Sequence, residues 1–354
     1  MVMGEKQVSK KERDSGLELL RILALLVTFW MHGASSYRNN EVSAWLCIVI
    51  ETIGNVGVPI FILISGYFGI RLKPKKMIQL DLMLIFYCWI GLALRFVWGD
   101  AAAYSGEQIL SYVFPVIGRN SWYFTCYFAL AFLSPFLNAF IEQLDKAAFK
   151  KMLLTMLVIF SGITTFFFFD ITQDGGKGIV NMVLLYLIGR YIRLYGEEKK
   201  IGKAKLGRWY ALILLACVAL NGALYVVTGT VQNKFARDNT LFTIGASICI
   251  FLIFKEIHFS SRFINEVASH VPAVFTMEWT LRGIITVYMF NYLAWNESNW
   301  HEWILLGICV LLIVMGTVID IVRVRLFGRI EEKLADGILH GIEKAAGAVK
   351  QKIR

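Results

Sequence analysis

The chain has 354 residues, of which 57% are hydrophobic and only 18% are charged, and its formal net charge is +10. One soluble core cannot bury so much apolar surface, so the composition excludes an ordinary soluble domain and favours a protein that uses lipid as its solvent. The positive charge does not indicate a nucleic-acid partner, because the basic residues are concentrated in loops and in a tail that flank apolar segments.

Apolar runs of about 18 to 25 residues recur along the chain, and each is long enough to cross a hydrocarbon core about 30 Å thick as a helix. They lack the period-2 alternation of a membrane β-barrel. The sequence therefore predicts an all-α integral membrane protein with about ten transmembrane helices. The predicted spans are Leu17–Ser35, Val42–Ile70, Met77–Trp98, Ser121–Ile141, Met152–Asp170, Ile179–Tyr195, Trp209–Thr228, Thr240–Ile257, Ala268–Tyr292 and Trp303–Val322.

Basic residues are distributed unevenly among the loops. The N-terminus, alternate loops and the C-terminal tail together hold 28 of the 36 Lys and Arg residues, whereas the opposite loops hold 5. The remaining three, Arg21, Arg95 and Arg282, lie within predicted spans. By the positive-inside rule, both termini are expected in the cytoplasm of a multi-pass plasma-membrane protein.

We expect one transmembrane domain over residues 1–322 and a basic cytoplasmic tail over residues 323–354. The first span has no small-residue cleavage site behind it, so it is not expected to be a cleaved signal peptide. In the tail, Ile330, Leu334, Ile338 and Ile342 recur at helical spacing. This pattern predicts an amphipathic helix, either on the anionic inner leaflet or solvated.

The six cysteines fall in six different predicted spans, with no C-x-x-C pair. They are expected to be small buried hydrophobic residues, with no metal site and no disulfide. They are Cys47, Cys88, Cys126, Cys217, Cys249 and Cys309.

The first predicted helix carries three ionisable residues, which are costly in a membrane unless they are paired or face a cavity. Glu18, Arg21 and His32 share one helical face, because eleven residues after Arg21 the helix returns to nearly the same direction. Arg21 is expected near the cytoplasmic end and His32 in the outer half of the membrane. Taken singly, Arg21 also fits a snorkelling cation paired with Glu18, and His32 a structural histidine.

Other polar residues in predicted spans are candidates for the same site. Glu51 is expected at the depth of His32, where it can orient the imidazole, with Glu18 as the alternative partner. Glu278 and Arg282 form an i, i+4 pair that must face the bundle interior, either at the site or as a structural clamp. Trp122 fits an interfacial aromatic belt or the outer end of the site.

The second span contains a helix-weakening stretch from Gly54 to Pro59, followed by Ser65-Gly66-Tyr67. Small residues there allow backbones or a ligand to approach closely, and packing between helices is the simpler explanation.

The spacing of Arg21 and His32 on the first helix resembles the Arg-x10-His motif of the acyltransferase-3 family, in particular its standalone envelope-modifying members in Gram-positive bacteria. The segment Phe61–Phe68 is similar to the family's Ile-Ser-Gly-Tyr stretch, and the resemblance extends from Leu17 to about Val322. The chain departs from the pattern at Glu278, where many members have a histidine in a late helix. The pair of basic residues that often follows the second helix in this family is also not clearly matched in this chain.

The resemblance implies a membrane-bound O-acyltransferase. Acyl-CoA, most simply acetyl-CoA, would bind on the cytoplasmic side with Arg21 at its phosphates or pantetheine and with Glu18, Ser65 and Tyr67 nearby. The acyl group would reach His32 and pass to a hydroxyl of an envelope glycan or a lipid-linked sugar. Two routes fit: His32 deprotonates the acceptor, or it carries the acyl group covalently. The resemblance implies no permanently bound cofactor.

A multi-pass transporter or exporter of an envelope precursor is the competing class. Such proteins also contain intramembrane charges and broken helices near a midplane site. The sequence shows no matching pair of interrupted segments in two halves, which favours the acyltransferase.

Overall fold

The computed structural model describes residues 14–34, 41–98, 104–198, 200–284 and 300–353. Within these residues the chain forms helices, turns and loops but no β-strand, which confirms the prediction of an all-α protein. The helices are, in chain order, α1 (Ser15–Ala34), α2 (Glu41–Gly54), α3 (Gly57–Phe68), α4 (Pro74–Trp98), α5 (Gly106–Val113), α6 (Trp122–Glu142), α7 (Lys146–Met156), α8 (Ile163–Phe167), α9 (Ile179–Tyr195), α10 (Lys203–Thr228), α11 (Leu241–Lys255), α12 (Arg262–Ser269), α13 (Val271–Ile284) and α14 (His301–Ile353), with a π-helical turn, Leu157–Gly162, between α7 and α8.

Seven helical segments in the described ranges are long and apolar enough to cross a membrane. They are α1, the α2–α3 pair, α4, α6, the α7–α8 segment, α10 and α14. The other three predicted spans correspond to shorter helices, because α9 has 17 residues, α11 has 15 and α13 has 14. The predicted ninth span continues to Tyr292, and its part from residue 285 onward lies outside the described residues. The architecture is that of a multi-pass membrane protein.

The second predicted span is interrupted between α2 and α3. A Cβ atom at Gly54 would lie 2.3 Å from Cβ of Met31, and a Cβ atom at Gly57 would lie 2.1 Å from Oγ1 of Thr28. Both glycines therefore allow α1 to pack directly against the break. The weak point predicted from the sequence is thus where the second span meets the first helix.

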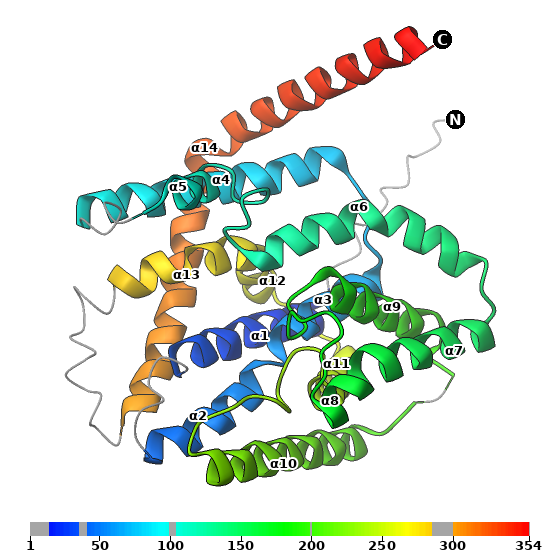
Figure 1. The fold of residues 1–354 in the computed structure, drawn as a ribbon. Helices are drawn as coiled ribbons and strands as arrows, with labels where there is room; N and C mark the ends of the chain where they lie inside the picture. The colour runs from blue at the N-terminus through cyan, green and yellow to red at the C-terminus, as the bar shows by residue number, and fades with distance from the viewer. Residues whose placement is uncertain (1–13, 35–40, 99–103, 199, 285–299, 354) are drawn as a thin grey trace, which may run out of the picture.

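Helix α1 lies in the middle of the molecule (Figure 1) and packs against α2, α3, α11, α12, α13 and α14. Leu20 and Ala24 belong to a hydrophobic cluster shared mainly with α3, α9 and α11. Leu25 and Phe29, farther along the helix, belong to a second cluster shared with α4, α13 and α14. Because α1 joins the two clusters, the polar residues on it are held within the packed part of the bundle.

Helix α14 is continuous over 53 residues and crosses the expected boundary between residues 322 and 323. Figure 1 shows its last part, in red, extending beyond the other helices. Ala335 in this part is completely buried, and Nζ of Lys75 at the start of α4 lies 2.8 Å from Asp336. Farther along, the apolar residues Ile338 and Ile342 are exposed, as are most of the polar residues around them. The beginning of the predicted tail is therefore packed against the body of the protein.

Candidate active site

Helix α1 carries an ion pair near its N-terminal end. Nη1 of Arg21 donates to Oε2 of Glu18 at 3.0 Å and to Oε1 at 3.4 Å. Glu18 is buried, whereas the Arg21 side chain is 24% exposed. A buried carboxylate is costly unless a cation compensates it, so the pair fixes the position of the guanidinium.

Arg21 lines a cavity of about 530 Å³, which we call the larger cavity. A second cation, Lys76 of α4, lines it as well, and so does Ser65 of α3. The other lining residues are mostly apolar or aromatic: Phe61, Leu80, Tyr123, Phe124, Tyr127, Ala268, Ser269, Val271, Pro272 and Phe275. Two cations on a largely apolar wall suit an extended ligand that is apolar along part of its length and anionic at one end.

His32, near the C-terminal end of α1, contacts α13. Its Nδ1 lies 2.8 Å from Oε2 of Glu278, which is 1% exposed. Nη2 of Arg282 donates to Oε1 of Glu278 at 2.6 Å and to the carbonyl oxygen of Phe29 on α1 at 2.8 Å. The imidazole, the carboxylate and the guanidinium therefore form one connected row across the interface between α1 and α13.

This row determines which nitrogen of the imidazole is basic. A carboxylate only accepts hydrogen bonds, so Nδ1 of His32 donates to Glu278, and the lone pair of the neutral ring is on Nε2. The positive charge of Arg282 compensates the negative charge of the buried Glu278 carboxylate. An imidazole held in one tautomer and one orientation by a carboxylate is suited to take a proton from a hydroxyl group.

His32 and Glu278 line a smaller cavity, of about 230 Å³, together with Trp122 and Trp279. The Trp279 ring stacks on the imidazole, with ring centroids 5.8 Å apart and an interplanar angle of 18°. The other lining residues of the smaller cavity are Leu84, Cys88, Pro115, Asn120, Ser121, Phe124, Phe275 and Thr276.

Phe124 and Phe275 line both cavities and form a shared wall. Their rings pack edge to face with centroids 5.9 Å apart. Arg21 faces the larger cavity and His32 the smaller one, and the two residues are eleven positions apart on α1. Eleven residues of helix span about 16 Å, so one face of α1 runs from one cavity to the other.

The structure changes the expected partner of His32. Glu51 was expected to orient the imidazole, with Glu18 as the alternative, but the carboxylate in contact with the ring is Glu278. Glu51 is completely buried on α2, and Glu278 belongs to a different helix, α13. Depth in the membrane did not identify Glu278 as a partner of the ring, because depth does not specify which helix packs against the outer half of α1.

The residues predicted to lie on the acyl-donor side do not all line the same cavity. Ser65 lines the larger cavity with Arg21, but Tyr67 lines neither of the two cavities in the described part of the chain. The Tyr67 hydroxyl accepts a hydrogen bond from Arg193 at 3.2 Å, and its ring packs against Phe251. The structure therefore gives Tyr67 a packing role.

Several residues near the cavities escaped the sequence analysis. Trp279 had no signal beyond its proximity to Glu278. Asp320 did have one, because it is a carboxylate inside a predicted span, the same feature that selected Glu278. It binds His270 next to the larger cavity, with Nδ1 of His270 2.6 Å from its Oδ2.

Over the described ranges, no group of three or more His, Cys, Asp or Glu side chains could hold a metal ion. All six cysteines carry free thiols.

The acyltransferase-3 family model, described as an acyltransferase domain, matches residues 14–319. The matched region begins just before α1 and ends within α14, so it contains both cavities. No curated protein and no solved structure gives a match. With the family model covering most of its length, the chain belongs to the acyltransferase-3 family and is a membrane acyltransferase.

Proposed function

We propose that the protein transfers an acyl group, most simply acetyl, from cytoplasmic acyl-CoA to a hydroxyl of an envelope glycan or lipid-linked sugar outside the plasma membrane. One observation carries the proposal: a single face of α1 presents Arg21 to the larger cavity and His32 to the smaller one, with Phe124 and Phe275 as the shared wall. Two substrates can thus approach one helix from two cavities.

The larger cavity has the chemistry that acyl-CoA requires. Arg21 and Lys76 supply cations for phosphate oxygens, and the planar guanidinium can bind them in a bidentate manner. Aromatic side chains such as Tyr127 and Phe61 offer apolar surface to the pantetheine arm and the acyl chain. The excess of Lys and Arg in one set of loops supports a cytoplasmic position for this cavity.

The smaller cavity suits a sugar hydroxyl. Trp122 and Trp279 present flat apolar surfaces, and Asn120 and Thr276 provide polar groups in the same lining. Ligand sites of this kind combine apolar walls with a few polar groups that fix orientation. The volume of about 230 Å³ limits the part of the acceptor that enters to a small unit, such as a single sugar ring.

In the proposed reaction His32 acts as general base. Its Nε2 accepts the proton of the acceptor hydroxyl as the oxygen attacks the thioester carbonyl carbon. The C–O bond forms, the C–S bond breaks, and CoA leaves as a thiolate that takes up a proton from the imidazolium or from water. Glu278 stabilises the imidazolium while it exists.

The proposal is tested with purified protein in lipid nanodiscs and acetyl-CoA labelled in its acetyl group. A pooled fraction of envelope glycans and lipid-linked sugars serves as acceptor. We expect release of free CoA and ester-linked label on the acceptor, both lost in His32→Ala. Cells that lack the protein should carry fewer acetyl esters on their envelope glycans. Wild-type protein that neither binds nor consumes acyl-CoA would overturn the proposal.

A further inference from the structure

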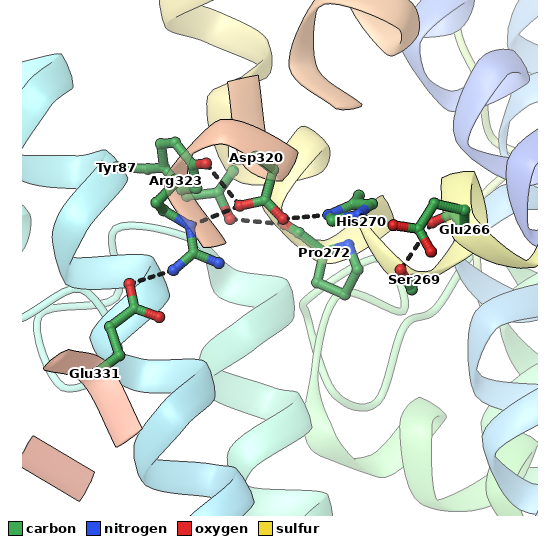
Figure 2. Close-up of polar contacts among 9 residues, drawn as sticks. Tyr87, Glu266, Ser269, His270, Pro272, Asp320, Arg323 and Glu331 are labelled. Atoms are coloured by element: carbon green, nitrogen blue, oxygen red, sulfur yellow. Dashed lines mark hydrogen bonds and ion pairs between the residues drawn. The ribbon is translucent and has the colours of Figure 1, made fainter. Parts of the chain in front are cut away.

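Asp320 of α14 is the centre of a buried polar network (Figure 2). Its Oδ1 accepts hydrogen bonds from the hydroxyl of Tyr87 and from Nε of Arg323, both at 2.6 Å, and its Oδ2 accepts one from Nδ1 of His270 at 2.6 Å. All four side chains are buried. Groups removed from water in this way are stable only when they satisfy one another, so the network fixes the three parts of the chain that contribute to it.

The first of these parts is the corner between α12 and α13. His270 is the residue between the two helices, and its neighbours on either side, Ser269 and Val271, line the larger cavity. Its second nitrogen, Nε2, lies 3.4 Å from Oε1 of Glu266, which is largely exposed. The strong, buried contact of the imidazole is therefore the one to Asp320.

The second part is α4. Tyr87 is on this helix, and two turns or more before it the same helix supplies Lys76 and Leu80 to the larger cavity. Asp320 thus binds both the helix and the corner that form much of the cavity lining. A change in the contacts of Asp320 would alter the distance between α4 and the α12–α13 corner.

The third part is the extension of α14. Arg323 donates to Asp320 through Nε and pairs with Glu331 through Nη1 (Figure 2). Slightly farther along, Glu332 and Asp336 pair with Lys75, the neighbour of the cavity residue Lys76. Glu332 and Asp336 therefore fasten this part of α14 to the start of α4, and Asp320 holds α14 against the middle of the same helix.

We propose that Asp320 is a positioning residue for the acyl donor: through His270 and Tyr87 it holds the α12–α13 corner against α4 and thereby sets the affinity of the larger cavity. The inference rests on the proposed function, in which this cavity binds acyl-CoA. His32 and Glu278 line the other cavity, so the network controls donor binding without taking part in the chemistry.

The test uses substitutions of His270 that differ in where they place a hydrogen-bond donor. His270→Asn keeps an amide N–H near the position of Nδ1, whereas His270→Gln places it near the position of Nε2, and His270→Ala has none. Each is compared with wild type for acetyl-CoA binding by calorimetry and for kcat and KM. Glu266→Gln is the matched control, because it alters only the long, exposed contact.

For His270→Ala and His270→Gln we expect the Kd and the KM for acetyl-CoA to rise about tenfold or more, with kcat within about twofold of wild type. His270→Asn and Glu266→Gln should bind the donor within about threefold of wild type. A purely structural role would instead lower thermal stability in all three His270 variants, and their affinities for acetyl-CoA would not follow this order. Should His270→Ala fail to fold, Tyr87→Phe removes one hydrogen bond from the same network while keeping the ring, and the same rise in Kd is expected.

Equal donor affinity in wild type, His270→Ala and Tyr87→Phe overturns the inference while leaving the proposed function intact. A fall in kcat with unchanged KM does the same, because it would place the network in the chemistry. If wild-type protein binds no acyl-CoA, the proposed function fails, and the donor role of Asp320 fails with it.

Discussion

Nδ1 of His32 lies 2.8 Å from Oε2 of Glu278, which joins the imidazole of α1 to a carboxylate of α13. The resemblance to the acyltransferase-3 family left this position of the late helix without a role, because many members have a histidine where this chain has Glu278. The contact supplies one: the carboxylate orients the ring from a neighbouring helix. Substitutions of His32, Glu278 and Arg282 can test the ring, the carboxylate and the neighbouring cation separately.

His32→Ala should abolish acyl transfer while leaving acetyl-CoA binding and the melting temperature close to those of wild type. Loss of a general base typically lowers the rate about 10²-fold or more. The measurement is release of free CoA in the presence of acceptor. His258→Ala, which removes an exposed histidine paired with Asp14, is the control and should keep full activity. Retention of more than about a tenth of the activity by His32→Ala would show that another group is the base.

Glu278 and Arg282 should depend on each other for stability. Each single change, Glu278→Gln or Arg282→Gln, leaves a buried charge without its main compensation, which typically costs about 3–5 kcal/mol. The double variant leaves neither charge and should be more stable than either single variant. Thermal unfolding of the three purified proteins measures the coupling. Strictly additive losses would mean that the 2.6 Å contact contributes nothing.

Arg21→Ala should weaken acetyl-CoA binding strongly, whereas His32→Ala should not. Arg21→Lys should recover only part of the loss, because an ammonium keeps the charge but not the bidentate geometry. Arg21→Ala also removes the cation that pairs with the buried Glu18, so Glu18→Gln is added to the same chain to separate stability from binding. Calorimetry at one fixed salt concentration compares the variants, since screening alters phosphate contacts. Unchanged affinity in the Arg21→Ala/Glu18→Gln chain would remove Arg21 from the donor site.

The helices and the polar face of α1 could be predicted because they depend on local sequence. Long apolar runs specify helices in lipid, and the spacing of Arg21 and His32 places both on one side of a helix whatever surrounds it. The pairing of Glu18 with Arg21 and of Glu278 with Arg282 followed from helical spacing in the same way and is present in the structure.

The contacts between helices could not be predicted, because they depend on which helices pack together. His32 and Glu278 are 246 residues apart, and the placement of α13 against α1 is not encoded in either local segment. The continuity of α14 was missed for a related reason. The tail is polar enough to look separate, but Lys75 of α4 binds Glu332 and Asp336 in its first turns.

Gly66→Ala should destabilise the packing of α3 against α9. A Cβ atom at Gly66 would lie 2.2 Å from the carbonyl oxygen of Tyr186, so backbone and not a flexible side chain would have to move. Overpacking of this kind typically costs about 1–3 kcal/mol or more. Gly207→Ala on α10 is the control, because nothing lies within 4 Å of its added methyl group and helix propensity favours Ala. Equal melting temperatures for the two variants would show that α3 and α9 can separate without cost.

Ionisation of the Asp238 carboxyl should make the folded protein less stable as the pH rises. Burial raises the pKa of this carboxyl to about 7, with Asp174 adding to the effect and Lys177 partly opposing it. The residue is in the loop between α10 and α11, and Asn181 binds its backbone carbonyl at 3.2 Å, so the loop is held in place around it.

The sign follows from proton binding. The folded protein holds the Asp238 proton more tightly than the unfolded chain, whose carboxyl titrates near pH 4. The folded state therefore loses stability between about pH 4 and pH 7, by at most about 4 kcal/mol, and the loss is complete above pH 7. Asp238→Asn, which imitates the protonated carboxyl, should raise the melting temperature at pH 8 relative to wild type. The difference should vanish at pH 4, where both side chains are neutral in the fold. Thermal unfolding across this pH range in nanodiscs measures it, and a constant difference between the two proteins at all pH values would show that Asp238 is not the group that titrates.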